Sequence, residues 1–251
     1  MTIVFVHGIP ETPAVWGLLA ARLAEAGHED QVRLSPPGFG APVPAGFGAT
    51  VLDYRDWLVD ELERIGRPVD LVGHDWGGGH TVNVAMTRPD LIRTWCSDVV
   101  GLFDPDYVWH PIAQGWQTPG EGEAGIARLL AQTPAERAVL FTSNGMDPAI
   151  ALQLAEGFDE RMAACMLPLY PSARQPVMAD LGANLEAAAA RPGLAILATE
   201  DPVSGPVELR QRSSARAGAR VETLEGFNHW WMTEDEGRRG ATALISFWSS
   251  L

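Results

Sequence analysis

Hydrophobic residues alternate along the chain between two patterns. Short apolar and β-branched runs, typical of buried strands, occur at residues 3–6, 31–34, 68–73, 95–100, 194–198 and 220–224. Between them, apolar residues recur at helical spacing, as at Val15, Leu19 and Leu23. Repeated strand–helix–strand units predict a parallel sheet covered by helices on both faces.

The alternation lapses between residues 104 and 181, where helical stretches at 125–131, 134–142 and 149–167 follow one another without a strand. An insertion between the fourth and fifth strands is expected to lie at one rim of the sheet, as a lid. We therefore predict an α/β core formed by residues 1–103 and 182–251, with about six parallel strands, and a helical lid of residues 104–181.

Composition narrows the class of protein. The 251 residues include 18 basic and 32 acidic side chains, and this net charge of −14 argues against nucleic acid and anionic membranes as partners. Cys96 and Cys165 form neither a disulfide framework nor a metal-binding pair. No run of eighteen apolar residues occurs, and residues 3–6 are predicted to be a strand rather than part of a signal peptide. A cytoplasmic protein is expected.

The segment Gly-His-Asp-Trp-Gly-Gly at residues 73–78 lies between a predicted strand and a predicted helix. A glycine-flanked residue at such a junction is typical of a nucleophile elbow. Here the central residue is Asp75, so an aspartate is the candidate nucleophile.

Two further segments follow predicted strands and complete a candidate site. His-Gly-Ile-Pro-Glu at residues 7–11 follows the first strand, where the backbone amides of Ile9 and Trp76 would form an oxyanion hole, with His7 supporting the loop. His229, after the last strand, is the candidate base.

The third member of the set should be an acid after the fifth strand. Asp201 is the candidate acid there, with Glu200 pointing elsewhere. Asp98, at the end of the fourth strand, is a rival for this role.

These motifs resemble those of α/β-hydrolases of the aspartate-nucleophile branch, which includes epoxide hydrolases, haloalkane dehalogenases and fluoroacetate dehalogenases. The segment at residues 73–78 is shared by epoxide hydrolases and many haloalkane dehalogenases, so it does not choose between them. His-Gly-Ile-Pro-Glu is similar to the loop of epoxide hydrolases. Many haloalkane dehalogenases have a halide-binding Asn after that glycine, where this chain has Ile9.

The resemblance also implies two lid tyrosines that hold the epoxide oxygen. Tyr170 lies in a similar context, and Tyr107 is the other tyrosine of the insertion, whereas Tyr54 falls on a core-facing helix stripe. If Tyr107 faces away, Trp109 or His110 would occupy its place.

The mechanism implied by the resemblance is covalent. Asp75 attacks an epoxide carbon while Tyr170, with Tyr107 as partner, protonates the oxygen, and His229 oriented by Asp201 activates water to hydrolyse the ester. The substrate would be a small apolar molecule, and neither a metal nor an organic cofactor is required.

Two alternatives remain at this level. A haloalkane dehalogenase would use the same Asp75 and His229, with the indole of Trp76 and that of Trp109 or Trp116 binding the halide. A non-catalytic ligand-binding module is the other alternative, although binding alone needs no base.

Relatives of this branch normally have two further strands before the strand that precedes the oxyanion loop, giving eight in all. With those two missing, the strand at residues 31–34 becomes an exposed sheet edge. A homodimer that covers this edge is therefore expected.

Overall fold

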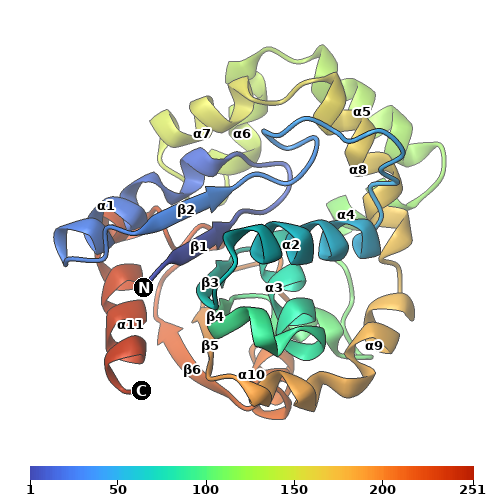
Figure 1. Ribbon diagram of the computed structural model, residues 1–251. Coiled ribbons are helices and arrows are strands. Elements are labelled where there is room, and N and C mark those ends of the chain that lie inside the picture. Colours follow the sequence, from blue (N-terminus) through green and yellow to red (C-terminus); the bar gives the residue numbers. More distant parts are fainter.

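One sheet organises the molecule, and the computed structural model describes all residues 1–251. Its six strands are parallel throughout and lie in the order β2-β1-β3-β4-β5-β6 (Figure 1). They are β1 (Ile3–Val6), β2 (Gln31–Leu34), β3 (Val69–Gly73), β4 (Ile92–Ser97), β5 (Gly193–Ala198) and β6 (Ala219–Leu224). The predicted six-stranded parallel sheet is confirmed, with β2 at one edge.

Each face of the sheet carries its own hydrophobic core, because successive strand residues point to opposite faces. Val4 and Val6 belong to one buried cluster, and Ile3 and Phe5 belong to the other. The first cluster is covered by α2 (Val51–Ile65), α3 (Trp76–Thr87) and α10 (Val207–Arg216). The second is covered by α1 (Gly17–Glu25) and α11 (Arg238–Ser249).

The fourth strand ends earlier than its apolar run predicts. It spans Ile92–Ser97 rather than residues 95–100, and its last pair with β5 joins Ser97 to Ala195. The backbone then leaves the ladder and forms a short 3₁₀ helix at Val100–Phe103. This divergence opens a gap between β4 and β5 at their carboxyl ends.

The insertion between β4 and β5 is helical, as predicted, and its helices form the upper and right-hand parts of Figure 1. They are α4 (Pro111–Gln117), α5 (Glu121–Ala131), α6 (Pro134–Thr142), α7 (Pro148–Glu156), α8 (Glu160–Ser172) and α9 (Val177–Leu181).

The prediction of a single helix over residues 149–167 was wrong. The stretch 149–167 is two helices, because the side chain of Asp159 accepts hydrogen bonds from the amides of Arg161 and Met162 and so begins α8.

The two ends of the insertion meet. A Cβ atom placed on Gly182 would lie 2.6 Å from Cβ of Phe103, so the glycine packs directly against that side chain. Farther along, the amide of Val51 donates to Oγ of Ser172 at 2.9 Å, which joins the end of α8 to the start of α2.

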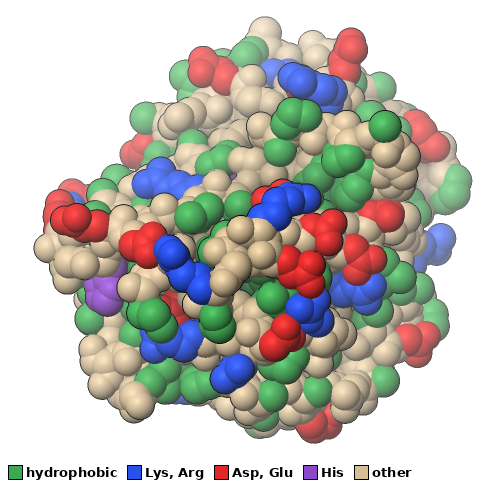
Figure 2. All heavy atoms as spheres, in the orientation of Figure 1, with side chains coloured by type: hydrophobic (Ala, Val, Ile, Leu, Met, Phe, Trp, Pro, Cys, Tyr) green, Lys and Arg blue, Asp and Glu red, His purple; other side chains and the backbone are tan.

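Charged side chains of both signs are mixed on the surface that Figure 2 shows, where acidic and basic side chains lie next to one another. None of the helices combines the length and apolar character needed to cross a lipid bilayer. Both cysteines, Cys96 and Cys165, are buried free thiols.

Candidate active site

Asp75 stands at a strained bend between β3 and α3. Its φ of 50° and ψ of −124° are unusual for a residue with a side chain. The bend requires glycine around it: a Cβ on Gly77 would lie 2.1 Å from the carbonyl oxygen of Val6, and one on Gly8 would lie 2.5 Å from Cβ of Asp75. Such strain persists only where neighbouring structure enforces it, as at functional sites.

The loop after β1 contacts the Asp75 carboxylate directly. The amide of Ile9 donates to Oδ1 of Asp75 at 2.9 Å. Trp76 is the first residue of α3, so its amide has no acceptor within the helix. His7 is fully buried, with Nδ1 2.8 Å from the carbonyl oxygen of Gly8, which fits support of this loop.

His229 connects Asp75 to Asp201. Its Nε2 lies 3.8 Å from Oδ2 of Asp75, and its Nδ1 lies 3.1 Å from Oδ2 of Asp201. Asp201 also accepts from the Ser204 hydroxyl at 2.5 Å and from the amides of Val203 and Ser204. The neighbouring Glu200 is exposed. Three residues from separate strand ends thus converge in the order carboxylate, imidazole, carboxylate.

Asp98 occupies a different position from the one its rival role requires. Its Oδ1 accepts from the amide of Asp75 at 3.0 Å, and its Oδ2 accepts from the indole of Trp231 at 2.7 Å. The same Oδ2 lies 2.5 Å from Nδ1 of His74. Since its oxygens are engaged beneath the elbow, Asp98 does not orient His229.

The protonation of this set follows from burial and mutual attraction. Burial raises the pKa of Asp75 to about 6, although His229 and His74 oppose the shift. Burial alone would lower the pKa of His229, but Asp201 raises it above its ordinary value. Burial would raise the pKa of Asp201, yet the His229 imidazole and the Ser204 hydroxyl hold it far below its usual range.

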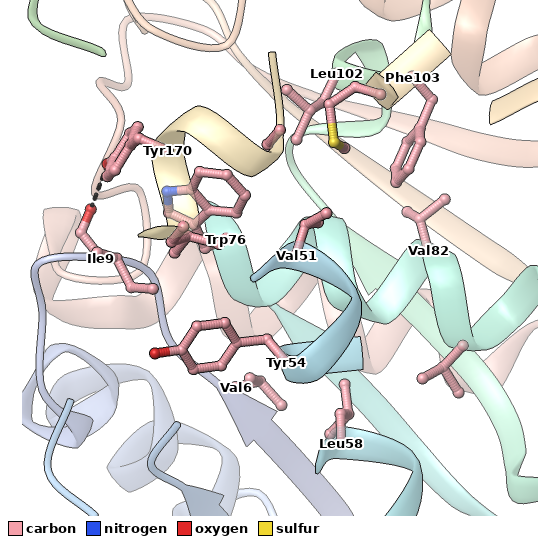
Figure 3. Close-up of a cluster of buried hydrophobic side chains, with 14 of the residues drawn as sticks. Val6, Ile9, Val51, Tyr54, Leu58, Trp76, Val82, Leu102, Phe103 and Tyr170 are labelled. Atoms are coloured by element: carbon pink, nitrogen blue, oxygen red, sulfur yellow. Dashed lines mark hydrogen bonds between the residues drawn. The ribbon is translucent and has the colours of Figure 1, made fainter. Parts of the chain in front are cut away.

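The two lid tyrosines differ in what their hydroxyls contact. Tyr170, on α8, is buried and donates to the carbonyl oxygen of Ile9 at 3.4 Å, a long contact that is drawn in Figure 3. Tyr107 donates to the carbonyl oxygen of Val203 at 3.0 Å. Burial raises the pKa of both phenols. Tyr170 therefore has the less committed hydroxyl.

Aromatic rings form one wall above the elbow. Trp109 stacks on Trp76 with ring centroids 5.4 Å apart, and Trp116 meets the ring of Tyr170 at 4.8 Å. The indole N–H of Trp109 is buried and has no acceptor. His110 is half-buried, and burial lowers its pKa to about 4.

A cavity connects these groups. It is lined by Ile9, Pro10, Glu11, Asp75, His110, Ile112, Trp116, Leu140, Phe141, Asn144, Tyr170, Val203, His229 and Trp230. A second, smaller cavity shares Asp75, His110 and Tyr170 and adds Trp76, Tyr107 and Trp109. Every predicted site residue except Asp201, which stands behind His229, lines one of these two cavities.

Comparison with known proteins gives the family. The profile described as the alpha/beta hydrolase family matches residues 3–241. The chain belongs to this family. This α/β hydrolase superposes on the crystal structure of a haloalkane dehalogenase loop variant from Bradyrhizobium elkanii with a TM-score of 0.70 and 22% identity, over 99% of this chain and 90% of that one. At that identity the likeness concerns the fold.

Two curated relatives match shorter stretches of the α/β hydrolase. An epoxide hydrolase from Caballeronia sordidicola is 36% identical over 108 residues, which is 41% of this chain and 31% of that protein. An (E)-2-((N-methylformamido)methylene)succinate hydrolase from Acinetobacter baylyi is 28% identical over 92 residues, 36% of this chain and 34% of that protein. The matches span about a third of each relative.

The α/β hydrolase also holds a buried charged cluster that sequence reasoning missed. Nε2 of His74 lies 3.1 Å from Oε1 of Glu11, and Glu11 accepts from the amide of Gly8 and the indole of Trp230. Burial alone would lower the pKa of His74, but Asp98 and Glu11 raise it well above its ordinary value. In return, His74 lowers the pKa of Glu11 to about 2 against the effect of burial. The only sequence signal was that Glu11 and His74 are themselves members of the two motifs at residues 7–11 and 73–78.

Glu11, His74 and His229 form the one group of three whose ligand atoms lie within 4.8 Å of one another. Nε2 of His74 and Oε1 of Glu11 already bond to each other at 3.1 Å, and Nδ1 of His229 is bound to Asp201, so a metal would have to displace existing bonds. The arrangement suits a hydrogen-bonded ion network better than a metal site.

Proposed function

We propose that this α/β hydrolase opens epoxides to vicinal diols through an ester on Asp75. The observation that carries the proposal is the position of one carboxylate: Asp75 accepts the Ile9 amide, lies 3.8 Å from His229 Nε2, and shares its cavity with the hydroxyl of Tyr170. Partial identity to an epoxide hydrolase supports the same activity.

The first half of the proposed reaction forms the ester. An Asp75 oxygen bonds to an epoxide carbon, the carbon–oxygen bond of the ring breaks, and the resulting alkoxide takes a proton from Tyr170. A phenol whose pKa is raised by burial keeps its proton until the alkoxide develops, which suits a general acid. Tyr107 and Trp109 shape the same wall.

The second half hydrolyses the ester. Water adds to the carbonyl carbon of Asp75 while His229, held by Asp201, takes its proton. Each amide of the oxyanion hole, from Ile9 and Trp76, contributes about 3 kcal/mol to the tetrahedral intermediate in related chemistry. The intermediate collapses to the diol, which takes the proton from His229. The proton of the re-formed Asp75 carboxyl then restores Tyr170.

The proposal is tested by trapping the ester. In His229→Ala, incubation with a styrene-oxide-type epoxide should increase the mass of the Asp75 peptide by the full mass of the epoxide. The matched control is Asp75→Asn with His229→Ala, which should remain unmodified. An unmodified Asp75 peptide in the single variant, despite a retained fold, would contradict the covalent mechanism.

Hydrolytic dehalogenation is the second candidate function. The unpartnered indole N–H of Trp109, stacked on Trp76, is the observation that favours it. An assay with short bromoalkanes distinguishes the two candidate functions. A dehalogenase releases bromide and transfers only the alkyl group to Asp75. An epoxide hydrolase gives diol without halide.

The charges around the cavity favour an uncharged substrate. Asp75 and Glu11 supply carboxylates, and none of the fourteen lining residues is Lys or Arg. A substrate carboxylate, such as those of a succinate derivative, would therefore meet like charge in a poorly solvated site. We expect a neutral epoxide to be turned over about a hundredfold faster, in kcat/KM, than a carboxylated epoxide of similar size. Equal values would exclude this charge selection.

A further inference from the structure

A buried arginine lies beside the site without a carboxylate partner. Arg210, on α10, has 3% of its surface exposed. Its Nη1 donates to the carbonyl oxygen of Ala198 at 2.9 Å and its Nη2 to that of Ile196 at 3.4 Å, while Nε has no acceptor. No carboxylate oxygen lies within 4.0 Å of the guanidinium.

These two carbonyls lie on β5, beyond the point where β4 diverges from it. The ladder between the strands ends at the pair Ser97–Ala195, so the last carbonyls on that side of β5 have no strand partner. The guanidinium of Arg210 donates to these carbonyls in place of a strand partner, and it fixes the end of β5 three residues before Asp201. The two side chains line the same surface groove.

Burying this cation has a cost that carbonyl contacts alone do not explain. Moving a charged group out of water is unfavourable by several kcal/mol unless opposite charge compensates it. The pKa of Arg210 is accordingly lowered by burial, while Asp201 and Asp98 oppose that effect. Asp98, which follows β4, and Asp201, which follows β5, supply the opposite charge that offsets the cost of burying the guanidinium.

We propose that Arg210 is a positioning residue for His229 that acts through Asp201, by anchoring the end of β5 and supplying the positive charge next to the triad acid. This inference rests on the proposed hydrolytic role of His229. Arg210 does not touch the cavity that holds Asp75.

Removing this charge should favour the protonated form of His229, because the guanidinium then no longer offsets part of the negative charge of Asp201 that attracts the imidazolium. Asp201 stays ionised at neutral pH, since it keeps its own four hydrogen bonds. The other titratable groups that act on His229 are Asp75, Asp98, Asp201, Glu11, His74 and His110. Two of them, Asp98 and Asp201, also interact with Arg210.

Three variants separate charge from hydrogen bonding. Arg210→Gln keeps an N–H donor and loses the charge, and Arg210→Lys keeps the charge. Arg216→Met removes a half-buried arginine of the same helix that pairs with Glu186. The pKa of His229 is followed by NMR of ¹⁵N-histidine-labelled protein and assigned with His229→Gln. Ester hydrolysis is followed in parallel against pH.

In Arg210→Gln, we expect the pKa of His229 to rise and ester hydrolysis at pH 7 to slow about tenfold, the ratio that corresponds to one pKa unit. Ester formation should change little. Arg210→Lys should keep the wild-type pKa, and Arg216→Met should match wild type in both measurements.

An unchanged His229 pKa in folded Arg210→Gln would overturn the proposal. If Arg210→Gln does not fold, a wild-type pKa in Arg210→Lys supports the charge role, and a raised pKa there overturns it. The NMR measurement needs no substrate. If the wild-type protein does not act on epoxides, the proposed function is refuted. The His229 pKa of the wild-type protein can still be compared with that of each variant.

Discussion

Single residues in this protein set the position of the Asp75 carboxylate, and Gly8 packs directly against it. In Gly8→Ala the new Cβ would lie 2.6 Å from Oδ1 of Asp75, so the side chain or the loop must move. Displacement of a reacting group by about 1 Å costs about a hundredfold in rate, and we expect that loss in ester formation.

The matched control is Gly115→Ala, on lid helix α4, where an added Cβ has no neighbour within 4 Å. It should leave the rate unchanged. Equal rates in the Gly8 and Gly115 variants would show that the elbow tolerates displacement.

The pKa values of Asp75 and His229 predict different pH profiles for the two half-reactions. Ester formation needs ionised Asp75, so its rate should fall about tenfold for each pH unit below about 6. Ester hydrolysis needs neutral His229, whose pKa is raised, so hydrolysis should slow as pH falls through that higher value. The ester should therefore accumulate just above pH 6, as measured by rapid quenching and mass spectrometry. Coincident profiles would contradict this assignment.

Tyr170 and Tyr107 are distinguished by removing one oxygen. Tyr170→Phe should slow epoxide opening by at least about a hundredfold, the usual contribution of a general acid, and leave ester hydrolysis unchanged. Tyr107→Phe should have a smaller effect, because that hydroxyl is bound to Val203. Tyr54→Phe is the control, since its hydroxyl donates to the carbonyl of Pro37 in the core. A wild-type rate in Tyr170→Phe would remove this residue from the mechanism.

At the scale of elements, α8 carries Tyr170 and is attached to the core by Ser172. In Ser172→Ala the first amide of α2, from Val51, loses its acceptor. The loss of such a contact at a helix start lowers the free energy of unfolding by about 1 kcal/mol. We expect this change in denaturant melts, together with a raised KM. An unchanged KM would show that this attachment does not position α8.

Most of the helices and strands could be predicted from the sequence. Asp75, Asp201 and His229 follow three separate strands, and the carboxyl ends of parallel strands share one edge, so their convergence could be predicted. The break before α8 was missed because Asp159 lies inside a helical hydrophobic pattern, where its capping role has no periodic signal. The end of β4 was misplaced because Asp98 is engaged by groups distant in sequence.

The charged cluster beneath the elbow could not be predicted for the same reason. Glu11, His74 and Asp98 lie in three different segments, and each became relevant only when the loops after β1, β3 and β4 packed together. Asp98 was considered as a rival triad acid, yet its partners are His74 and Trp231. Pairing of buried charges depends on tertiary distances that spacing along the chain does not encode.

For the whole molecule, the open edge of the sheet remains the feature that predicts an assembly. β2 is four residues long and pairs only with β1, and its residue Arg33 is exposed. We propose that a second copy covers this edge, so sedimentation should give about twice the 27.1 kDa of one chain. Arg33→Glu is the variant that should weaken the pairing. A single-chain mass at micromolar concentration would contradict it.

The contact between Phe103 and Gly182 has a consequence for how new specificities could arise. The two ends of the inserted segment touch. The number of residues between them therefore does not alter the spacing of β4 and β5. A segment of different size could be exchanged there while Asp75 and His229 keep their places. Asp75, Asp201 and His229 lie outside the insertion, whereas Tyr170 lies within it. A chimera with a foreign insertion should therefore lose the epoxide-opening acid and retain the proposed ester hydrolysis.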